Sequence, residues 1–225
     1  MLKAVIFDVD GTLLDTEKIY ITAWRQAAER FGYTLPQEAL RQTRAVSIPV
    51  AKERFRYYCG EAFPYDAVRV TRIEIAEEII RTVPLEQLCK PGAAELLQWF
   101  KAQGIALAAA TSTGKQQTLD HLERAELLQY FDAVVCGDMI ARGKPEPDIF
   151  LKAAELMGIA PEDCLVVGDT PADVKAAAAA GMQMVLIPDQ VPASEETLNL
   201  SWKYLQDLHQ LHSLLSTLLK GRSFC

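Results

Sequence analysis

Between Ala93 and Ile187 the sequence alternates between helical and strand patterns, and this alternation constrains the fold more than any other feature. The spacing of apolar residues predicts helices over 93–104, 115–129, 147–158 and 172–180, and strands over 105–110, 133–136, 164–167 and 184–187. Consecutive parallel strands need a crossover connection, which is usually a helix. The alternation therefore predicts an α/β fold with a doubly wound, Rossmann-like parallel sheet covered by helices on both faces.

One further strand is expected at 4–7, but only helical patterns follow it, at about 16–31, 36–43, 50–58 and 64–83. We therefore expect an all-helical domain, residues 16–88, inserted into an α/β core made of 1–15 and 89–225. Two chain crossings between the domains would form a hinge, which suits a lid. Leucines near the C-terminus predict a final amphipathic helix over 205–219.

Composition excludes several classes of function. Half of the 225 residues are hydrophobic, which supports a sizeable core, and the formal net charge of −7 argues against nucleic acid or a membrane surface as the main partner. The first residues run directly into a strand rather than a signal peptide, and no apolar run has transmembrane length. Five scattered cysteines are expected to be reduced, so we expect a cytoplasmic protein.

Two acids, Asp8 and Asp10, follow the first strand, and Gly11 allows a sharp turn after them. In parallel α/β sheets, ligands bind at the carboxyl ends of the strands. A single acid there often only marks where the chain meets water. Two acids one residue apart repel each other unless a cation or a shared proton lies between them, so this pair favours chemistry.

Three more polar clusters follow later strands: Thr111-Ser112, Gly143-Lys144-Pro145, and Gly168-Asp169-Thr170 with Asp173. Each has an ordinary structural explanation, namely a helix cap, a solvated loop charge, and an N-cap with a first-turn acid. Together they place several acids, a hydroxyl and a lysine at one sheet edge. That combination predicts Mg²⁺ held by carboxylates, with a lysine and helix N-termini to bind a phosphoryl group.

These motifs resemble, in order, the four motifs of the haloacid dehalogenase superfamily of phosphotransferases: Asp8-Val9-Asp10-Gly11-Thr12, Ser112, Lys144 before Pro145, and Gly168-Asp169 with Asp173. The resemblance covers essentially the whole chain. The helical insert is similar to the cap domain of the branch that contains β-phosphoglucomutase and phosphoglycolate phosphatase.

The resemblance implies that Asp8 is the nucleophile, forming an aspartyl-phosphate, and that Asp10 is the general acid and then the general base. It also implies that Mg²⁺ is held by Asp8, the backbone carbonyl of Asp10, Asp169 and Asp173, the last directly or through water. Dehalogenase members lack the second acid and act without a metal. Asp10 and Asp169 therefore argue against dehalogenation.

Thr111, Ser112 and Lys144 are the groups expected to bind the phosphoryl oxygens. Lys144 is also expected to act in catalysis, because its charge offsets that of Asp8 and helps to keep that carboxylate ionised.

The expected function is Mg²⁺-dependent hydrolysis of a small phosphorylated metabolite, most simply a sugar phosphate, by a monomer or weak homodimer. A β-phosphoglucomutase-like phosphohexomutase is the alternative. Mutase relatives usually carry Glu-Asp-Ser where this chain has Gly168-Asp169-Thr170, which favours a phosphatase. Arg41, Arg44 and Lys52 in the insert could hold a second phosphate, or could simply be solvated.

A remote alternative is a phosphate-binding protein without turnover. Such a protein would be expected to have lost Asp8 or Asp10, and this chain has both.

Overall fold

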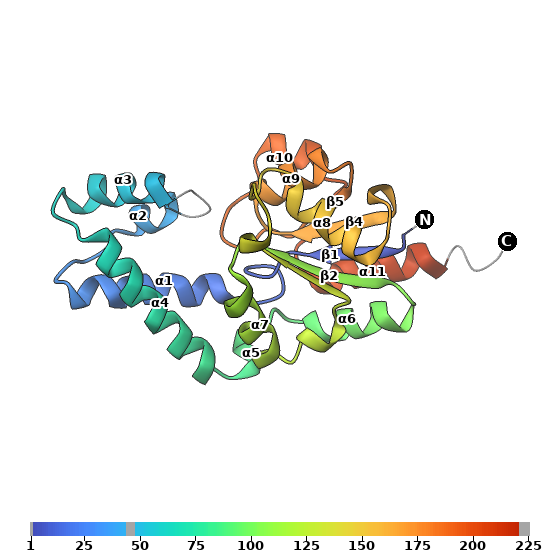
Figure 1. The fold of residues 1–225 in the computed structure, drawn as a ribbon, viewed down its shortest axis with the longest axis horizontal. Coiled ribbons are helices and arrows are strands. Elements are labelled where there is room, and N and C mark those ends of the chain that lie inside the picture. Colours follow the sequence, from blue (N-terminus) through green and yellow to red (C-terminus); the bar gives the residue numbers. More distant parts are fainter. Residues whose placement is uncertain (1, 44–47, 221–225) are drawn as a thin grey trace. The chain divides into compact units, whose positions relative to one another are not determined.

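The computed structural model describes residues 2–43 and 48–220. The chain divides into two compact units. The first comprises Met1–Asp15 and Leu85–Cys225, and the second comprises Thr16–Pro84. The chain therefore passes between the units twice, at 15–16 and at 84–85 (Figure 1).

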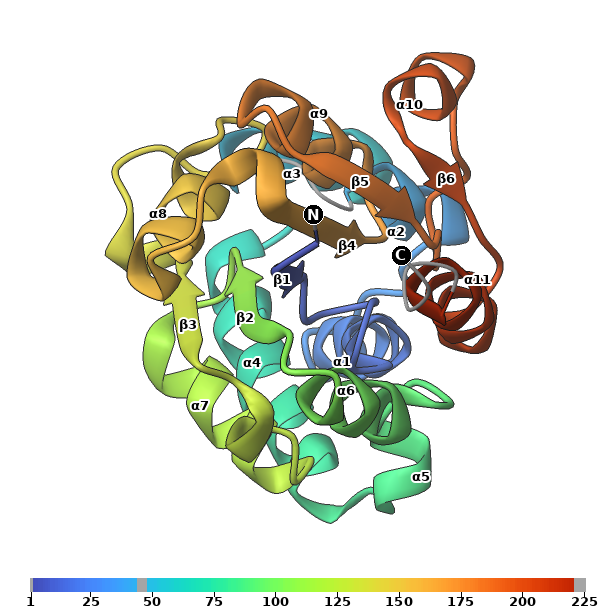
Figure 2. The same ribbon diagram turned by 90° about the vertical axis from the view of Figure 1, so that its right-hand side faces the viewer.

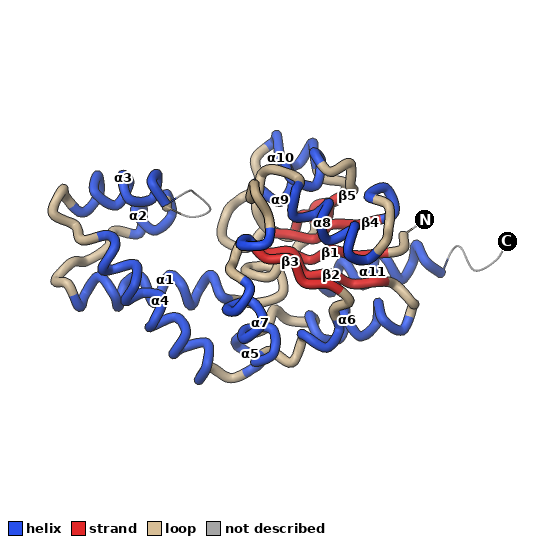
Figure 3. Tube along the Cα trace, viewed as in Figure 1, coloured by secondary structure: helices blue, strands red, loops and turns tan. Residues whose placement is uncertain are grey.

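The first unit is built on a six-stranded parallel sheet with the strand order β3-β2-β1-β4-β5-β6, which can be followed in Figure 2. The strands are β1 (Ala4–Phe7), β2 (Ala106–Thr111), β3 (Ala133–Cys136), β4 (Cys164–Gly168), β5 (Gln183–Leu186) and β6 (Lys203–Tyr204). The α-helices of this unit are α5 (Leu85–Leu88), α6 (Ala93–Ala102), α7 (Lys115–Arg124), α8 (Asp148–Met157), α9 (Pro171–Ala179), α10 (Glu195–Leu200) and α11 (Leu208–Lys220). Short 3₁₀ turns lie at Leu128–Tyr130, Gly137–Met139 and Pro161–Asp163. This arrangement confirms the predicted fold class (Figure 3).

Helices cover both faces of the sheet. Successive side chains of a strand point to opposite faces, so neighbouring residues of β1 contact different helices. Ile6 packs in one buried cluster with Phe150 of α8 and Val174 of α9. Its neighbour Phe7 meets Phe100 of α6 edge to face, with ring centroids 6.0 Å apart. The central strand β1 is buried along its whole length, which explains its uninterrupted apolar sequence.

The described part of the second unit contains four helices: α1 (Thr16–Arg30), α2 (Gln37–Gln42), α3 (Ile48–Cys59) and α4 (Tyr65–Thr82). A cluster of aromatic rings forms part of its packing. Trp24 of α1 contacts Phe55 of α3 with ring centroids 4.7 Å apart, and Phe55 stacks on Phe63 at 5.4 Å. The helical spacing of aromatic residues in this segment therefore reflects packing.

The structure corrects two predictions of secondary structure. The expected helix over 115–129 ends at Arg124, since Glu126 adopts a positive φ of 58° and a 3₁₀ turn follows. The strand at 184–187 was expected to be the last, but β6 pairs beyond it. Both side chains of β6 are exposed, so this two-residue strand has no apolar pattern by which the sequence could reveal it.

Within residues 2–43 and 48–220, no helix combines the length and hydropathy needed to cross a bilayer. The cysteines in that part, Cys59, Cys89, Cys136 and Cys164, are all free. Cys225 and Arg44 lie outside the described residues.

Candidate active site

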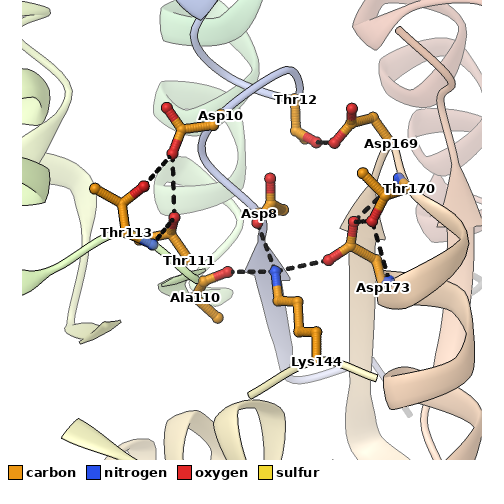
Figure 4. A network of polar contacts seen from close by, with 10 residues as sticks. All are labelled: Asp8, Asp10, Thr12, Ala110, Thr111, Thr113, Lys144, Asp169, Thr170 and Asp173. Carbon is orange, nitrogen blue, oxygen red and sulfur yellow. Dashed lines mark hydrogen bonds and ion pairs between the residues drawn. The ribbon is translucent and has the colours of Figure 1, made fainter. Parts of the chain in front are cut away.

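Parallel pairing brings two of the predicted acid clusters together at one edge of the sheet. Phe7 at the end of β1 pairs with Val167 of β4, and the N–H of Asp8 donates to the Val167 carbonyl at 2.8 Å. Asp8 and Asp169 therefore leave adjacent strands at the same edge (Figure 4). Strand β2 ends at Thr111, which places its hydroxyl on the other side of Asp8.

Lys144 is buried against these carboxylates. Its ammonium donates to Asp8 Oδ1 at 2.5 Å and to the Ala110 carbonyl at 2.9 Å, and lies 2.6 Å from Asp173 Oδ1. Only 4% of the lysine side chain is exposed, so the interpretation of Lys144 as a solvated loop charge is wrong. A buried ammonium is retained only where paired charges compensate its lost hydration.

The site is short of positive charge. Burial raises the pKa of Asp8 to about 8, although Lys144 opposes the shift, and the charge of Asp173 adds to it. Burial alone would lower the pKa of Lys144, but Asp173 and Asp8 outweigh it, so its pKa is raised and it stays charged. One lysine thus faces two buried carboxylates, and a further cation would relieve their repulsion.

A divalent cation fits this arrangement. Asp8, Asp169 and Asp173 are buried, and each offers a carboxylate oxygen within 4.8 Å of the others. Carboxylate oxygens are the ligands that Mg²⁺ prefers. The side chain of Asp10 is not part of this cluster and lies toward Thr111 and Thr113 instead (Figure 4).

Two hydroxyls orient Asp10. Its Oδ2 accepts from Thr113 Oγ1 at 2.8 Å and from Thr111 Oγ1 at 3.2 Å. The Thr111 hydroxyl in turn accepts from the N–H of Thr113 at 3.1 Å. Thr111 was predicted to bind a phosphoryl group, but its buried hydroxyl donates to Asp10, whereas Ser112 is exposed.

Asp173 has two contacts that sequence reasoning treated as alternatives. Thr170 is the N-cap of α9, and Asp173 Oδ2 accepts from the Thr170 N–H in a capping box. The other oxygen, Oδ1, lies against Lys144. The cap is therefore Thr170, and it orients Asp173 toward the site. A threonine followed three residues later by an acid is the signal that could have revealed it.

Sequence reasoning missed two hydroxyls of the site, Thr113 and Thr12. Thr12 Oγ1 donates to Asp169 Oδ1 at 3.2 Å. Thr12 stands in the first motif, Asp8-Val9-Asp10-Gly11-Thr12, but was given no role there, and Thr113 has no spacing that distinguishes it from an ordinary loop threonine.

Gly11 lies closest to the carboxylate cluster among the described glycines that have a positive φ. Its φ is +87°, and a Cβ there would lie 2.5 Å from Asp169 Oδ2. The substitution Gly11→Ala is expected to lower the free energy of unfolding by about 1–3 kcal/mol and also to weaken Mg²⁺ binding, because Asp169 must move. Urea unfolding and calorimetric Mg²⁺ titration measure the two effects.

Gly158→Ala is the matched control, because Gly158 has a φ of +66° and nothing within 4 Å of an added Cβ. It should show the backbone strain alone. Wild-type Mg²⁺ affinity in Gly11→Ala would contradict the expectation that Asp169 is a metal ligand.

The sequence and structure were compared with known proteins. Residues 2–181 match the family model described as haloacid dehalogenase-like hydrolase. A phosphorylated carbohydrates phosphatase of Thermotoga maritima is 34% identical over 82% of this chain and 84% of its own length. A phosphoglycolate phosphatase of Nitrosospira multiformis is 35% identical over 83% of each chain.

A similar solved structure comes from a Thermotoga maritima protein provisionally named a β-phosphoglucomutase. It matches with a TM-score of 0.81 and 28% identity over 96% of this chain and 99% of that one. The similarity thus extends over both the sheet-based unit and the helical unit.

Proposed function

The chain belongs to the haloacid dehalogenase-like hydrolases, and from this premise we propose that it hydrolyses a small phosphomonoester through an aspartyl-phosphate on Asp8. The match over residues 2–181 confirms the family that the motifs indicated. One observation carries the proposal: a buried Asp8 held at 2.5 Å by Lys144, beside two further carboxylates. This is a nucleophile whose charge Lys144 offsets in part, and the proposed cation would offset the rest.

In the proposed first step, a carboxylate oxygen of Asp8 attacks phosphorus, and the bond from phosphorus to the ester oxygen breaks. Asp10 gives its proton to the departing oxygen, which leaves as an alcohol. In the second step Asp10, now a carboxylate, takes a proton from water, and the water oxygen attacks phosphorus and releases Asp8. Thr111 and Thr113 keep the Asp10 carboxyl in one orientation through both steps.

Asp8, Asp169 and Asp173 would hold Mg²⁺, with the Asp10 backbone carbonyl as a further ligand, and the ion would offset negative charge on the phosphoryl group. Lys144 and the exposed Ser112 are the side chains proposed to contact phosphoryl oxygens. Lys144 is fixed on three sides by Asp8, Asp173 and the Ala110 carbonyl, so its charge is already in place when substrate arrives.

A sugar phosphate is the proposed substrate class. The Thermotoga maritima relative, 34% identical, is named a phosphorylated carbohydrates phosphatase, which supports this choice. We also propose that the helical unit Thr16–Pro84 acts as a cap that selects the substrate. Finally, we assign the enzyme to the cytoplasm, where disulfides are rare, because the four described cysteines are free.

The mutase alternative has one observation in its favour and one against it. Arg72 of the helical unit lines a cavity of about 130 Å³, with its guanidinium 4.2 Å from the Tyr20 ring centroid, and could receive a second anionic group. At position 168, however, a Cβ would lie 2.9 Å from the Asp173 Cβ, so the glutamate of the mutase pattern would displace Asp173. We therefore rank the phosphatase first.

Of the insert cations considered in the sequence, Arg41 and Lys52 form ion pairs, and Arg44 lies outside the described residues. Arg41 pairs with Glu38 at 2.6 Å on the surface, and Lys52 pairs with Asp66.

Hydrolysis of a panel of sugar phosphates, phosphoglycolate and nucleotides tests the proposal. We expect phosphate release from at least one sugar phosphate with Mg²⁺, and its loss on chelation with EDTA. Saturating Mg²⁺ should also raise the unfolding temperature, since a ligand at 100 times its Kd stabilises the folded state by about 2.7 kcal/mol. Hydrolysis unaffected by EDTA would show that the reaction does not depend on Mg²⁺.

The same panel should include β-glucose 1-phosphate, assayed for both free phosphate and glucose 6-phosphate. Glucose 6-phosphate formed without free phosphate would reverse the ranking of phosphatase and mutase.

A further inference from the structure

Helix α7 begins beside the proposed catalytic loop, and its first N–H is capped from a distant segment. The N-cap position is Gly114, which has no side chain to cap the helix. Asp138, which follows β3, takes this role: its two carboxylate oxygens accept from the N–H of Lys115 at 3.1 and 3.0 Å. A carboxylate at a helix N-terminus is favoured both by the hydrogen bond and by the helix dipole.

The residue next to Asp138 braces the same loop. The N–H of Gly137 donates to the Thr113 carbonyl at 3.0 Å. Gly137 also lies so close to the Ser112 carbonyl that a Cβ at position 137 would collide with it. The loop 111–114 is therefore held from one side by a single short segment.

That loop sets the direction of Asp10. Thr113 donates through its hydroxyl to Asp10 Oδ2 at 2.8 Å and through its N–H to the Thr111 hydroxyl at 3.1 Å. Thr111 completes the pair of donors to the same carboxylate oxygen. Any displacement of Thr113 would move both hydrogen bonds that orient Asp10.

The position of Asp138 also changes one expectation from the sequence. The N-terminus of α7 was expected to attract a phosphate, because helix N-termini carry unpaired N–H groups. Here a carboxylate already accepts from the first N–H, at Lys115. This end of α7 thus serves to fix the loop.

We propose that Asp138 is a positioning residue for proton transfer by Asp10, acting through the loop 111–114; this inference rests on the phosphatase function proposed above. Asp138 itself contacts neither the carboxylate cluster nor Lys144 among the contacts described, and it is exposed. Its removal should therefore misplace the proton donor while leaving the nucleophile and the metal ligands intact.

Leaving-group dependence separates these roles. A sugar alkoxide needs a proton to depart, whereas p-nitrophenolate leaves without one. In Asp138→Ala we expect kcat/KM to fall about 10- to 100-fold for the sugar phosphate hydrolysed fastest by the wild type, because general acid catalysis contributes about 10²- to 10⁴-fold. For p-nitrophenyl phosphate we expect kcat/KM to fall less than about threefold, because kcat/KM covers the steps up to departure of p-nitrophenolate and not the later hydrolysis in which Asp10 acts as base.

Two variants control this experiment. Asp138→Asn keeps an oxygen that accepts from the Lys115 N–H. Its ratio of kcat/KM for the sugar phosphate to kcat/KM for p-nitrophenyl phosphate should therefore lie close to that of the wild type. Asp132→Ala removes another exposed aspartate, which accepts from the Leu107 N–H at 2.8 Å at the opposite edge of β2 and β3. In Asp132→Ala the ratio of the two kcat/KM values should equal that of the wild type. An equal loss on both substrates in Asp138→Ala would show a merely structural role and overturn the proposal.

Hydrogen exchange gives a readout that needs no turnover. The amides of Thr113 and Lys115 should exchange faster in Asp138→Ala than in the wild type, and should be unchanged in Asp132→Ala. Unchanged exchange at both amides in Asp138→Ala would overturn the inference whatever the activity. A wild type that hydrolyses no phosphate ester would instead refute the proposed function, so the two failures are distinguishable.

Discussion

The Asp8→Asn protein is expected to hydrolyse neither sugar phosphates nor aryl phosphates, with kcat reduced at least about 10⁴-fold. An amide is a poor nucleophile and cannot form the acyl phosphate, yet it has the shape of the carboxyl it replaces. The loss should therefore be of chemistry and not of folding. Steady-state phosphate release with a sensitive coupled assay measures it.

The folding stability of Asp8→Asn, in contrast to its activity, should be unchanged or increased. Asp8 is buried, and burial opposes its ionisation, so a neutral side chain removes an unfavourable charge. Lys144 keeps Asp173 as an ion-pair partner. With EDTA present, the unfolding temperature of Asp8→Asn should be equal to or above that of the wild type. Substantial hydrolysis by the folded variant would remove Asp8 from the role of nucleophile.

The second large effect is expected from Lys144→Met. The substitution leaves Asp8 and Asp173 facing each other without the ammonium that contacts both. Removing one partner of a buried ion pair costs about 3–5 kcal/mol of folding stability. Activity should fall at least about 10²–10³-fold, the usual cost of losing one preorganised electrostatic contact. Methionine has nearly the length of lysine and can pack on Phe150, whose ring centroid lies 5.0 Å from Nζ.

The stability loss should depend on pH. A carboxyl whose pKa is raised in the folded state binds protons more tightly there than in the unfolded chain, so it destabilises the fold as pH rises toward that pKa. The pKa of Asp8 is already raised to about 8 with Lys144 present, and losing the lysine must raise it further. Below about pH 8 the folded state of both proteins keeps Asp8 protonated, so the deficit of Lys144→Met in EDTA should be smaller at about pH 7 than at about pH 10, where Asp8 of the wild type is ionised.

Urea unfolding at the two pH values measures this difference. Lys152→Met is the control, because Lys152 forms a surface pair with Glu155 at 2.9 Å and is 39% exposed. Such a pair is worth no more than about 1 kcal/mol. A deficit in Lys144→Met that is independent of pH would contradict the charge account.

Much of the fold follows from the sequence, because a buried parallel strand leaves a strong pattern. The run 4–7 and the helix–strand alternation after Ala93 predicted the sheet, and the register then brought Asp8 and Asp169 together. The burial of Lys144 could not be read from Gly143-Lys144-Pro145, since a lysine in a loop looks the same whether it is solvated or paired.

The rest depended on contacts that have no local pattern. Thr113, Thr12 and Asp138 act through hydrogen bonds to residues about 20 or more positions away, and threonines and aspartates are common in loops. Strand β6 forms through backbone pairing alone, with the Trp202 N–H donating to the Met184 carbonyl at 2.8 Å. Such contacts become visible only when the chain is folded.

The central claim is that Asp8 carries the phosphoryl group during turnover, and reductive trapping tests it most directly. Wild-type enzyme mixed with its best sugar phosphate is quenched in acid, reduced with borohydride, digested with trypsin and sequenced by mass spectrometry. An acyl phosphate on aspartate is reduced to the alcohol, so the account predicts homoserine at position 8 in the peptide 4–18, dependent on substrate and absent from Asp8→Asn. Reduction at another residue, or active turnover with position 8 unreduced, would contradict it.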